Sequence, residues 1–139
     1  MMRASESAAA RFQHTREAHR LELAEDYVEV ILDLIEESGE ARTTEIADRI
    51  GVAHPTVAKA MRRLEREGLV RLEPYRPTVL TEEGMILARE CRSRHRIVVQ
   101  FLIALGLDSQ SAETEAEGIE HHVSSSTLGL MEKFTLEQN

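Results

Sequence analysis

Helical periodicity, with apolar residues three and four positions apart, marks most of the chain. It predicts helices over residues 12–37, 45–50, 54–67, 82–105, 109–122 and 124–134. Gly39, Gly51 and Gly106 follow three of these segments, and glycine commonly ends a helix. Thr81-Glu82-Glu83-Gly84 precedes the longest one with a capping pattern. The pattern predicts a mainly α chain whose small and polar residues 1–10 are frayed.

Two of the short segments have the pattern of a helix-turn-helix. Ala47, Gly51 and Val57 supply the small, turn and buried residues that this motif needs. The second helix is expected to bury Val57, Met61 and Leu64 and to leave a basic face outside. A plain helical hairpin is the alternative, but the spacing, the small residues and the basic face agree on a DNA-binding motif.

Two short apolar runs follow the second helix and flank the turn Pro74-Tyr75-Arg76-Pro77, which predicts a β-hairpin. The prolines favour an isolated or edge hairpin over the interior of a sheet. A hairpin directly after a recognition helix is the wing of a winged helix. The expected DNA-binding residues are His54, Pro55, Thr56, Lys59, Arg63 and Arg76.

Charge is distributed unevenly along the 139 residues, whose net charge is −8. Residues 54–76 contain six basic and three acidic residues, whereas residues 106–139 contain seven acidic residues and one lysine. A basic segment within an acidic protein is a local footprint for DNA phosphates. The aromatic content of 4% favours an aliphatic helical core over a β-sandwich.

Several protein classes lack support in the sequence. No run approaches 18 apolar residues and the N-terminus has no apolar signal segment, so we expect neither a membrane span nor export. The single cysteine, Cys91, cannot form an internal disulfide, and a reducing cytoplasm is the expected compartment. There is no His-Glu-x-x-His motif, nucleophile constellation or glycine-rich phosphate loop, and we expect no enzyme.

Glu117, Glu120 and His121 form the densest cluster of possible metal ligands, because positions i, i+3 and i+4 share one helix face. Two carboxylates and an imidazole suit manganese, ferrous iron or zinc. A solvated helix face is the alternative interpretation. Three residues do not complete such a site, and the further candidates are Asp26, Glu29 and His95. His122 is expected to point away from this face.

A winged helix, a long helix and then Glu-x-x-Glu-His make a specific set. Over about residues 12–135 it resembles the manganese transport regulators of the diphtheria-toxin-repressor family. The matching stretches are Asp26-Tyr27-Val28-Glu29, Gly51-Val52, Pro55-Thr56-Val57-Ala58-Lys59, Arg94-His95 and Glu117-Gly118-Ile119-Glu120-His121-His122-Val123-Ser124. The resemblance implies six ligands to two divalent cations: Asp26, Glu29, His95, Glu117, Glu120 and His121. It also implies a homodimer on palindromic operators.

The expected function is a manganese-activated regulator, mainly a repressor, of metal-transport genes. Glu117 favours Mn²⁺, since iron-responsive relatives have a softer cysteine there, although Fe²⁺ stays possible. The alternative is an iron-responsive or metal-independent winged-helix regulator. The long helix exposes more apolar surface than so short a chain covers, which favours a homodimer.

We expect an N-terminal extension over residues 1–20, a DNA-binding domain over 21–81 and a helical dimerisation and metal-binding domain over 82–139. No third, SH3-like domain is expected. The extension has four arginines, Arg3, Arg11, Arg16 and Arg20, and is either an additional DNA-contacting arm or a tail. We favour the tail. The wing has Tyr75-Arg76-Pro77 where the resemblance leads us to expect Arg-Gly, so its turn should differ.

Overall fold

The computed structural model describes the backbone of residues 2–139 and the side chains of residues 8–16, 19 and 21–139. The elements are α1 (Met2–Ser38), α2 (Thr43–Ile50), α3 (His54–Arg66), β1 (Val70–Arg71), β2 (Val79–Leu80), α4 (Glu82–Ala104), α5 (Ser109–Ile119), the 3-10 turn η1 (Glu120–His122) and α6 (Ser125–Gln138). The predicted fold class, a winged helix-turn-helix followed by an all-helical domain, is confirmed.

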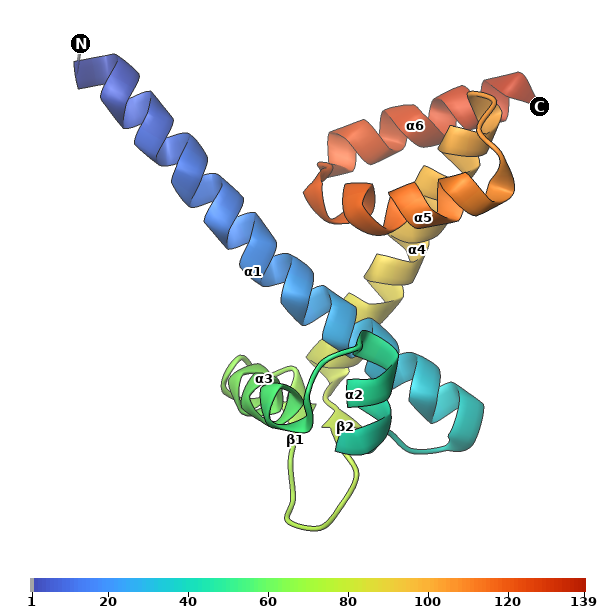
Figure 1. Cartoon of the computed structure of the whole chain (residues 1–139). Helices are drawn as coiled ribbons and strands as arrows, with labels where there is room; N and C mark the ends of the chain where they lie inside the picture. The colour runs from blue at the N-terminus through green and yellow to red at the C-terminus, as the bar shows by residue number, and fades with distance from the viewer. Residues whose placement is uncertain (1) are drawn as a thin grey trace.

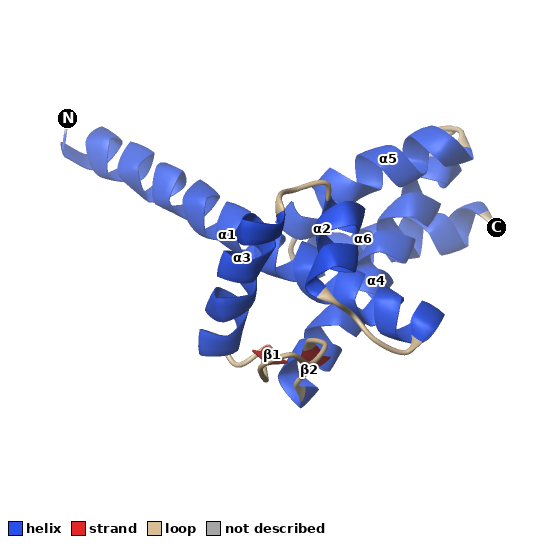
Figure 2. Cartoon of the chain, turned by 60° about the horizontal axis from the view of Figure 1, so that its bottom comes forward, coloured by secondary structure: helices blue, strands red, loops and turns tan. Residues whose placement is uncertain are grey.

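Two long helices, α1 and α4, organise the molecule (Figure 1). Helices α2 and α3 and the two-stranded sheet lie at one end of α4, while α5 and α6 pack along its other end. Figure 2 shows how small the sheet is beside the helices. The N-terminal part of α1 projects away from both groups, and its Arg11 and Arg16 are exposed.

The apolar side chains form two separate cores. The larger core joins the second half of α1 to α2, α3, the sheet and the start of α4, with Val28, Ile31, Ile46 and Val57 fully buried. The smaller core joins the second half of α4 to α5 and α6. The middle of α4 lies between the two cores, and its side chains there are largely polar.

The turns of the winged helix follow from a few backbone positions. Gly51 adopts a φ of 83°, in the left-handed region that glycine tolerates best, and its N–H bonds to the carbonyl of Ala47 at 2.8 Å. In the wing, Val70 pairs with Leu80. The wing turn contains Tyr75 with a φ of 63°, the one non-glycine residue with positive φ in the described backbone. The turn therefore carries local strain where glycine would carry none.

The start of α4 packs closely against the wing. Thr81 caps the helix as predicted, accepting a hydrogen bond from the Gly84 N–H at 3.1 Å. A Cβ atom at Gly84 would lie 2.0 Å from the carbonyl oxygen of Leu69, so only glycine fits there. This close approach fixes the direction in which α4 leaves the winged helix.

Four predicted helix boundaries differ from the structure by two residues or more. α1 begins at Met2 rather than near residue 12, because residues 2–11 are good helix formers without an apolar stripe. α2 begins at Thr43 rather than at residue 45, after the N-cap Arg42, whose backbone N–H bonds to Glu45 Oε1 at 3.3 Å. α6 continues to Gln138 rather than ending at residue 134. The predicted helix over 109–122 ends at Ile119 and tightens into η1. None of the helices in the described part of the chain combines the length and apolar character of a membrane span.

Candidate metal centre and nucleic-acid interface

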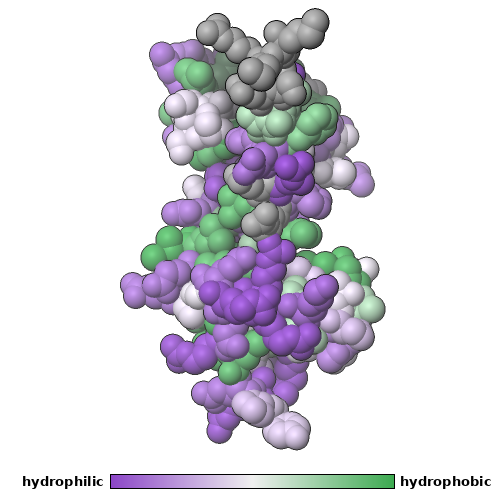
Figure 3. Space-filling view, turned by 90° about the vertical axis from the view of Figure 1, so that its left-hand side faces the viewer, coloured by the Kyte–Doolittle hydropathy of each residue, from purple (hydrophilic) through white to green (hydrophobic). Residues whose placement is uncertain are grey.

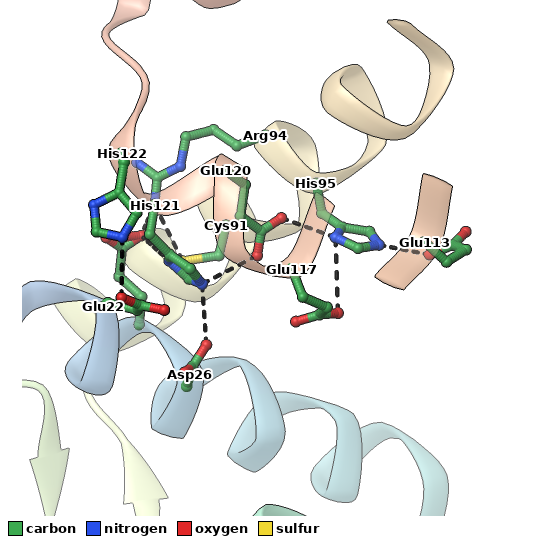
Figure 4. A network of polar contacts seen from close by, with 11 residues as sticks. Glu22, Asp26, Cys91, Arg94, His95, Glu113, Glu117, Glu120, His121 and His122 are labelled. Carbon is green, nitrogen blue, oxygen red and sulfur yellow. Dashed lines mark hydrogen bonds and ion pairs between the residues drawn. The ribbon is translucent and has the colours of Figure 1, made fainter. Parts of the chain in front are cut away.

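Acidic and imidazole side chains fill the space between the two apolar cores (Figure 4). α1 supplies Glu22, Glu25, Asp26 and Glu29, and α4 supplies His95. The last turn of α5 and η1 complete the cluster from the other side, so three segments far apart in the sequence meet there. The elements brought together belong to both halves of the molecule.

The first group of possible ligands is His95, Glu117 and Glu120, whose ligand atoms all lie within 4.8 Å of one another. His95 Nδ1 is 2.9 Å from Glu120 Oε2 and 3.8 Å from Glu117 Oε1. The other ring nitrogen, Nε2, lies 2.7 Å from Glu113 Oε2. A second carboxylate behind the ring fixes the tautomer of a ligating histidine, so Nδ1 is free to face a cation.

The second group is Glu22, Asp26 and His121, which meet the same distance limit. His121 Nε2 lies 3.0 Å from Asp26 Oδ1 and 3.3 Å from Glu120 Oε1. Its Nδ1 faces Glu25 Oε2 at 3.6 Å. Glu120 stands between the two groups, with one oxygen toward each histidine.

The buried polar atoms of this cluster fit a divalent cation. Within the described side chains, those that are buried without a hydrogen-bond partner gather here: Glu29 Oε2, Arg94 Nε, His95 Nδ1, both Glu120 carboxylate oxygens and both His121 ring nitrogens. Such atoms are costly to bury unpaired. Carboxylate oxygens and imidazole nitrogens are also the donors that Mn²⁺, Fe²⁺ and Zn²⁺ accept.

The local pKa shifts reflect the crowding of negative charge. Burial raises the pKa of Glu120 to about 7, and the nearby Glu29 and Glu117 add to the rise against the opposing effect of His95 and His121. Burial also raises the pKa of Glu29, with Glu117 as the next cause. Burial and neighbouring negative charge therefore favour the protonated forms of Glu29 and Glu120.

The carboxylates that surround His95 and His121 raise the pKa of both imidazoles and so favour their charged forms. Burial lowers the pKa of His95, but the hydrogen bond to Glu113 and the charge of Glu120 outweigh it, and the net pKa is raised. For His121, burial also lowers the pKa, but the adjacent Asp26 carboxylate and the charge of Glu120 outweigh it, and the net pKa is raised. Both imidazoles thus tend to hold a proton in the cation-free chain, and metal binding has to release it.

The 3-10 turn changes which residues share a face. An unbroken helix was predicted to align Glu117, Glu120 and His121, but η1 turns His121 toward α1 while Glu117 stays beside His95. His122, predicted to point away, reaches α1 too, and its Nε2 lies 3.0 Å from Glu22 Oε2. Glu29 belongs to neither group but lines the adjoining cleft with Asp26 and Glu117.

Glu25 is a central residue that the sequence analysis missed. Its side chain is 2% exposed, and it contacts Arg94 Nη2 and accepts a hydrogen bond from the Cys91 thiol at 3.1 Å. Cys91 itself is buried, and burial raises the pKa of its thiol, so it is a packed hydrogen-bond donor rather than a reactive group. Glu25 joins α1 to α4 directly behind His121.

The predicted DNA-binding residues lie on α3 and the wing. His54, Pro55, Thr56 and Lys59 are exposed, whereas Arg63 is half-buried and pairs with Glu67 at 3.1 Å. Figure 3 looks onto the side of the molecule where α3 lies in Figure 1, and hydrophilic residues dominate the centre of that face. The surface offers polar and charged contacts around the recognition helix.

Two further basic residues belong to this surface. Arg62 is exposed and lines a groove between α3 and the wing, together with His54 and the predicted Arg76. Arg42, from the start of α2, lines the same groove and is exposed as well. The sequence contains a signal for Arg62. On a helix whose buried face carries Val57, Met61 and Leu64, the 3.6-residue period places Arg62 on the exposed face.

Comparisons with known proteins agree with this geometry. Residues 21–77 match the family "Iron dependent repressor, N-terminal DNA binding domain", and residues 81–136 match "Iron dependent repressor, metal binding and dimerisation domain". The chain is 52% identical over 124 residues to the transcriptional regulator MntR of Salmonella typhi, covering 89% of this chain and 79% of that protein. The chain belongs to the iron-dependent repressor family. Its resemblance to that family, based on the motifs alone, is confirmed.

More distant members of the iron-dependent repressor family are also similar. The HTH-type transcriptional regulator MntR of Bacillus subtilis (strain 168) is 39% identical over 100 residues, covering 72% of this chain and 70% of that protein. A solved "Manganese-dependent transcriptional repressor complex with manganese" superposes with a TM-score of 0.73 at 32% identity, over 81% of this chain and 52% of that one.

The solved manganese regulator SloR superposes with a TM-score of 0.71 at 31% identity. The match covers 84% of this chain and 54% of the SloR chain, so the present chain spans about half the length of these solved family members. Both groups of candidate ligands lie within residues 21–77 and 81–136, which the two family descriptions match.

Proposed function

We propose that this chain is a manganese-activated transcriptional regulator, mainly a repressor, that binds palindromic operators of metal-transport genes as a cytoplasmic homodimer. One observation carries the proposal: two groups of possible ligands join α1 of the winged helix to α4, α5 and η1 of the helical domain. The MntR names of its relatives point to the same function. We place the domains at residues 21–81 and 82–139, after an extension over 1–20 that we interpret as a tail.

The ligands we propose for two Mn²⁺ ions per subunit are Asp26, Glu29, His95, Glu117, Glu120 and His121. The proximity of His95, Glu117 and Glu120, and that of Asp26 and His121, supports this set. Bound cations would supply positive charge to a cluster of four carboxylates. Without them, like charges on α1, α5 and η1 crowd together: burial raises the pKa of Glu29, and the charge of Glu117 adds to the rise.

Coupling to DNA follows from where these residues lie. Asp26 and Glu29 belong to α1, which packs directly on α2, so the position of α1 helps to set the position of the helix-turn-helix. A homodimer reads two successive major grooves only if its recognition helices stand about 34–36 Å apart. Drawing α1 onto the helical domain selects one such arrangement from an ensemble, which makes metal and DNA binding mutually reinforcing.

At the DNA, Lys59 and Arg76 are proposed to contact phosphates, as is Arg62, while Pro55 and Thr56 at the start of α3 face base edges. His54 is proposed as a further phosphate contact. Arg63 is proposed to add positive charge to the DNA-binding surface from the side of α3. The exposure of His54, Pro55, Thr56, Lys59, Arg62 and Arg76 and the groove between α3 and the wing support this assignment. Phosphate contacts position the protein, and base contacts give sequence preference.

Fluorescence anisotropy with an operator duplex tests the function. We expect affinity to rise at least about 100-fold between excess chelator and saturating Mn²⁺, the upper part of the usual range of coupling free energies. Equal affinity in the two conditions would favour a metal-independent winged-helix regulator. A control duplex of scrambled sequence separates operator recognition from phosphate attraction.

The identity of the metal needs its own experiment, because the family description names iron whereas the similar relatives are MntR proteins. We propose Mn²⁺ because every candidate ligand is a carboxylate or an imidazole. Glu117 is exposed, so Glu117→Cys introduces one soft thiolate without changing the packing of the core. Activation of DNA binding by Fe²⁺ or Co²⁺ should then improve relative to Mn²⁺ by about tenfold. An unchanged metal series would assign selectivity to other residues.

A further inference from the structure

Glu22 is a carboxylate one helical turn before Asp26, and it lies outside the six proposed ligands. Positions i and i+4 of a helix share a face, so both side chains point from α1 toward η1 (Figure 4). Glu22, Asp26 and His121 each place one possible ligand atom within 4.8 Å of the other two. This group is distinct from the group formed by His95, Glu117 and Glu120.

The histidine of this group points to a ligand independently of the acidic residues. The side chain of His121 is completely buried, and neither ring nitrogen has a hydrogen-bond partner. Its Nε2 approaches Asp26 Oδ1 at 3.0 Å without the geometry of a hydrogen bond. A buried imidazole that faces carboxylates in this way is arranged as a cation ligand rather than as a packed core residue.

His122 holds Glu22 in place. Its Nε2 lies 3.0 Å from Glu22 Oε2, and His19 approaches the same oxygen at 3.8 Å. Because η1 is a 3-10 turn, the adjacent His121 and His122 both reach α1, one at Asp26 and the other at Glu22. A hydrogen bond to one carboxylate oxygen orients the other, as outer partners of metal ligands commonly do.

We propose that Glu22 is a seventh metal ligand, completing the position formed by Asp26 and His121, and that His122 is its positioning residue. The inference rests on the proposed function. Two carboxylates and one imidazole give this position an oxygen-rich donor set, which suits Mn²⁺ better than softer cations. The competing interpretation is a simple tether, in which Glu22 and His122 only join α1 to η1.

Mn²⁺ titration of the full-length protein, with free aqueous Mn²⁺ followed by EPR, separates the two interpretations. Wild type should take up two ions per chain. Glu22→Gln should weaken one of the two binding steps at least about tenfold and leave the other within about twofold. Glu83→Gln, an exposed carboxylate at the start of α4, is the matched control and should change neither step.

The His122 variants test positioning. His122→Ala should weaken the same step about threefold to tenfold, and His122→Gln, which can still donate a hydrogen bond, should restore most of it. Thermal melting in excess chelator is the second readout. If Glu22→Gln and His122→Ala lower the melting temperature but leave both binding steps unchanged, the pair is a tether and the inference is overturned.

Failure of the inference differs visibly from failure of the proposed function. If wild type takes up no Mn²⁺, the proposed function falls, and the inference falls with it. If wild type takes up Mn²⁺ and Glu22→Gln binds it identically, only the inference is overturned. An operator-binding assay on the same samples then shows whether manganese activation continues without Glu22.

Discussion

The winged helix and the junction between the domains are built on opposite principles. The winged helix buries aliphatic side chains around Val28, Ile31 and Ile46 and leaves its charges exposed. The junction buries Glu25, Glu120 and His121 and leaves several of their polar atoms without partners. The winged helix is stabilised by its own apolar contacts, whereas the buried polar atoms of the junction need a bound cation as their partner. A metal-responsive regulator needs this division, because a site that is equally stable without its metal would not shift the conformational equilibrium when the metal binds.

The largest effect is expected at the residue between the two ligand groups. Glu120→Gln removes a buried charge whose pKa is raised to about 7, chiefly by burial. Above that pH, the metal-free protein should become more stable by about 1–3 kcal/mol, since the amide needs no ionisation. Mn²⁺ affinity should fall at least about 100-fold, because a charged ligand is lost.

Differential scanning calorimetry in chelator and titration with Mn²⁺ measure both effects on the same sample. Glu132→Gln, an exposed carboxylate on α6, is the control and should change neither quantity. A Glu120→Gln variant that is destabilised and still binds Mn²⁺ normally would show that Glu120 is a structural residue, contrary to the proposed ligand set.

The same comparison explains what the sequence could and could not predict. Helix stops at Gly39 and Gly51 and the cap at Thr81 depend on local chemistry, and the structure has them as predicted. The role of Glu25 depends on α4 crossing α1 at Arg94 and Cys91, which no pattern within α1 contains. Adjacent acidic residues on one helix look equivalent in sequence, and only the packing distinguishes them.

The change from α5 to η1 was equally hidden. Residues 117–122 contain no proline and one glycine, Gly118, and an isolated glycine does not by itself end a helix, so periodicity predicted a continuous helix with one ligand face. The tightening at Glu120 instead distributes the candidate ligands over two groups and brings His122 Nε2 within 3.0 Å of Glu22 Oε2. Tertiary contacts with α1 and α4 therefore decide a boundary that local propensity leaves open.

Adding a methyl group where α4 packs against the winged helix should have the next largest effect. A Cβ at Gly84 would lie 2.0 Å from the Leu69 carbonyl oxygen, and backbone cannot move away as a side chain can. Gly84→Ala should lower the free energy of unfolding by about 2 kcal/mol or more. Gly129→Ala in α6, where no atom lies within 4 Å of the added carbon, is the matched control. It should be neutral or stabilising by up to about 1 kcal/mol. Urea unfolding measures both, and equal effects would contradict the close packing of α4 on the wing.

The pH dependence of the metal-free protein should reveal the junction. Glu120 has its folded pKa raised to about 7, so between its usual pKa and 7 the folded chain binds more protons than the unfolded chain, and stability falls as pH rises. His95 and His121 also have raised pKa values, and the stability they give is complete below the ordinary histidine pKa and lost as pH rises further.

The three residues act in the same direction, so the free energy of unfolding in chelator should fall by about 1–3 kcal/mol between pH 5.5 and pH 8. With saturating Mn²⁺ the stabilisation by metal should grow over the same range, because binding displaces these protons. Thermal melts at several pH values, with and without Mn²⁺, measure both trends. A metal-free protein that gains stability toward pH 8 would contradict the crowded-carboxylate account of the junction.

The smallest effects are expected on the exposed basic surface, where each charge acts nearly alone. Arg62 is exposed and lines the groove beside the wing, whereas Arg63 is half-buried and already paired with Glu67. Arg62→Ala should therefore weaken operator binding about threefold to tenfold and reduce the salt slope by about one, as loss of a phosphate contact does. Arg63→Ala should have a smaller effect, although Arg63 was the residue predicted from sequence.

Anisotropy titrations of the Mn²⁺-loaded protein over a salt series measure both slopes, and Lys133→Ala on α6 is the control for an exposed cation away from α3. If Arg63→Ala flattens the salt dependence and Arg62→Ala does not, the ion pair with Glu67 must open when DNA binds. The DNA-binding surface would then include the side of α3 that faces α1. Arg63 would contact DNA only after its ion pair with Glu67 opens, just as the junction makes its metal contacts only when the cation is bound.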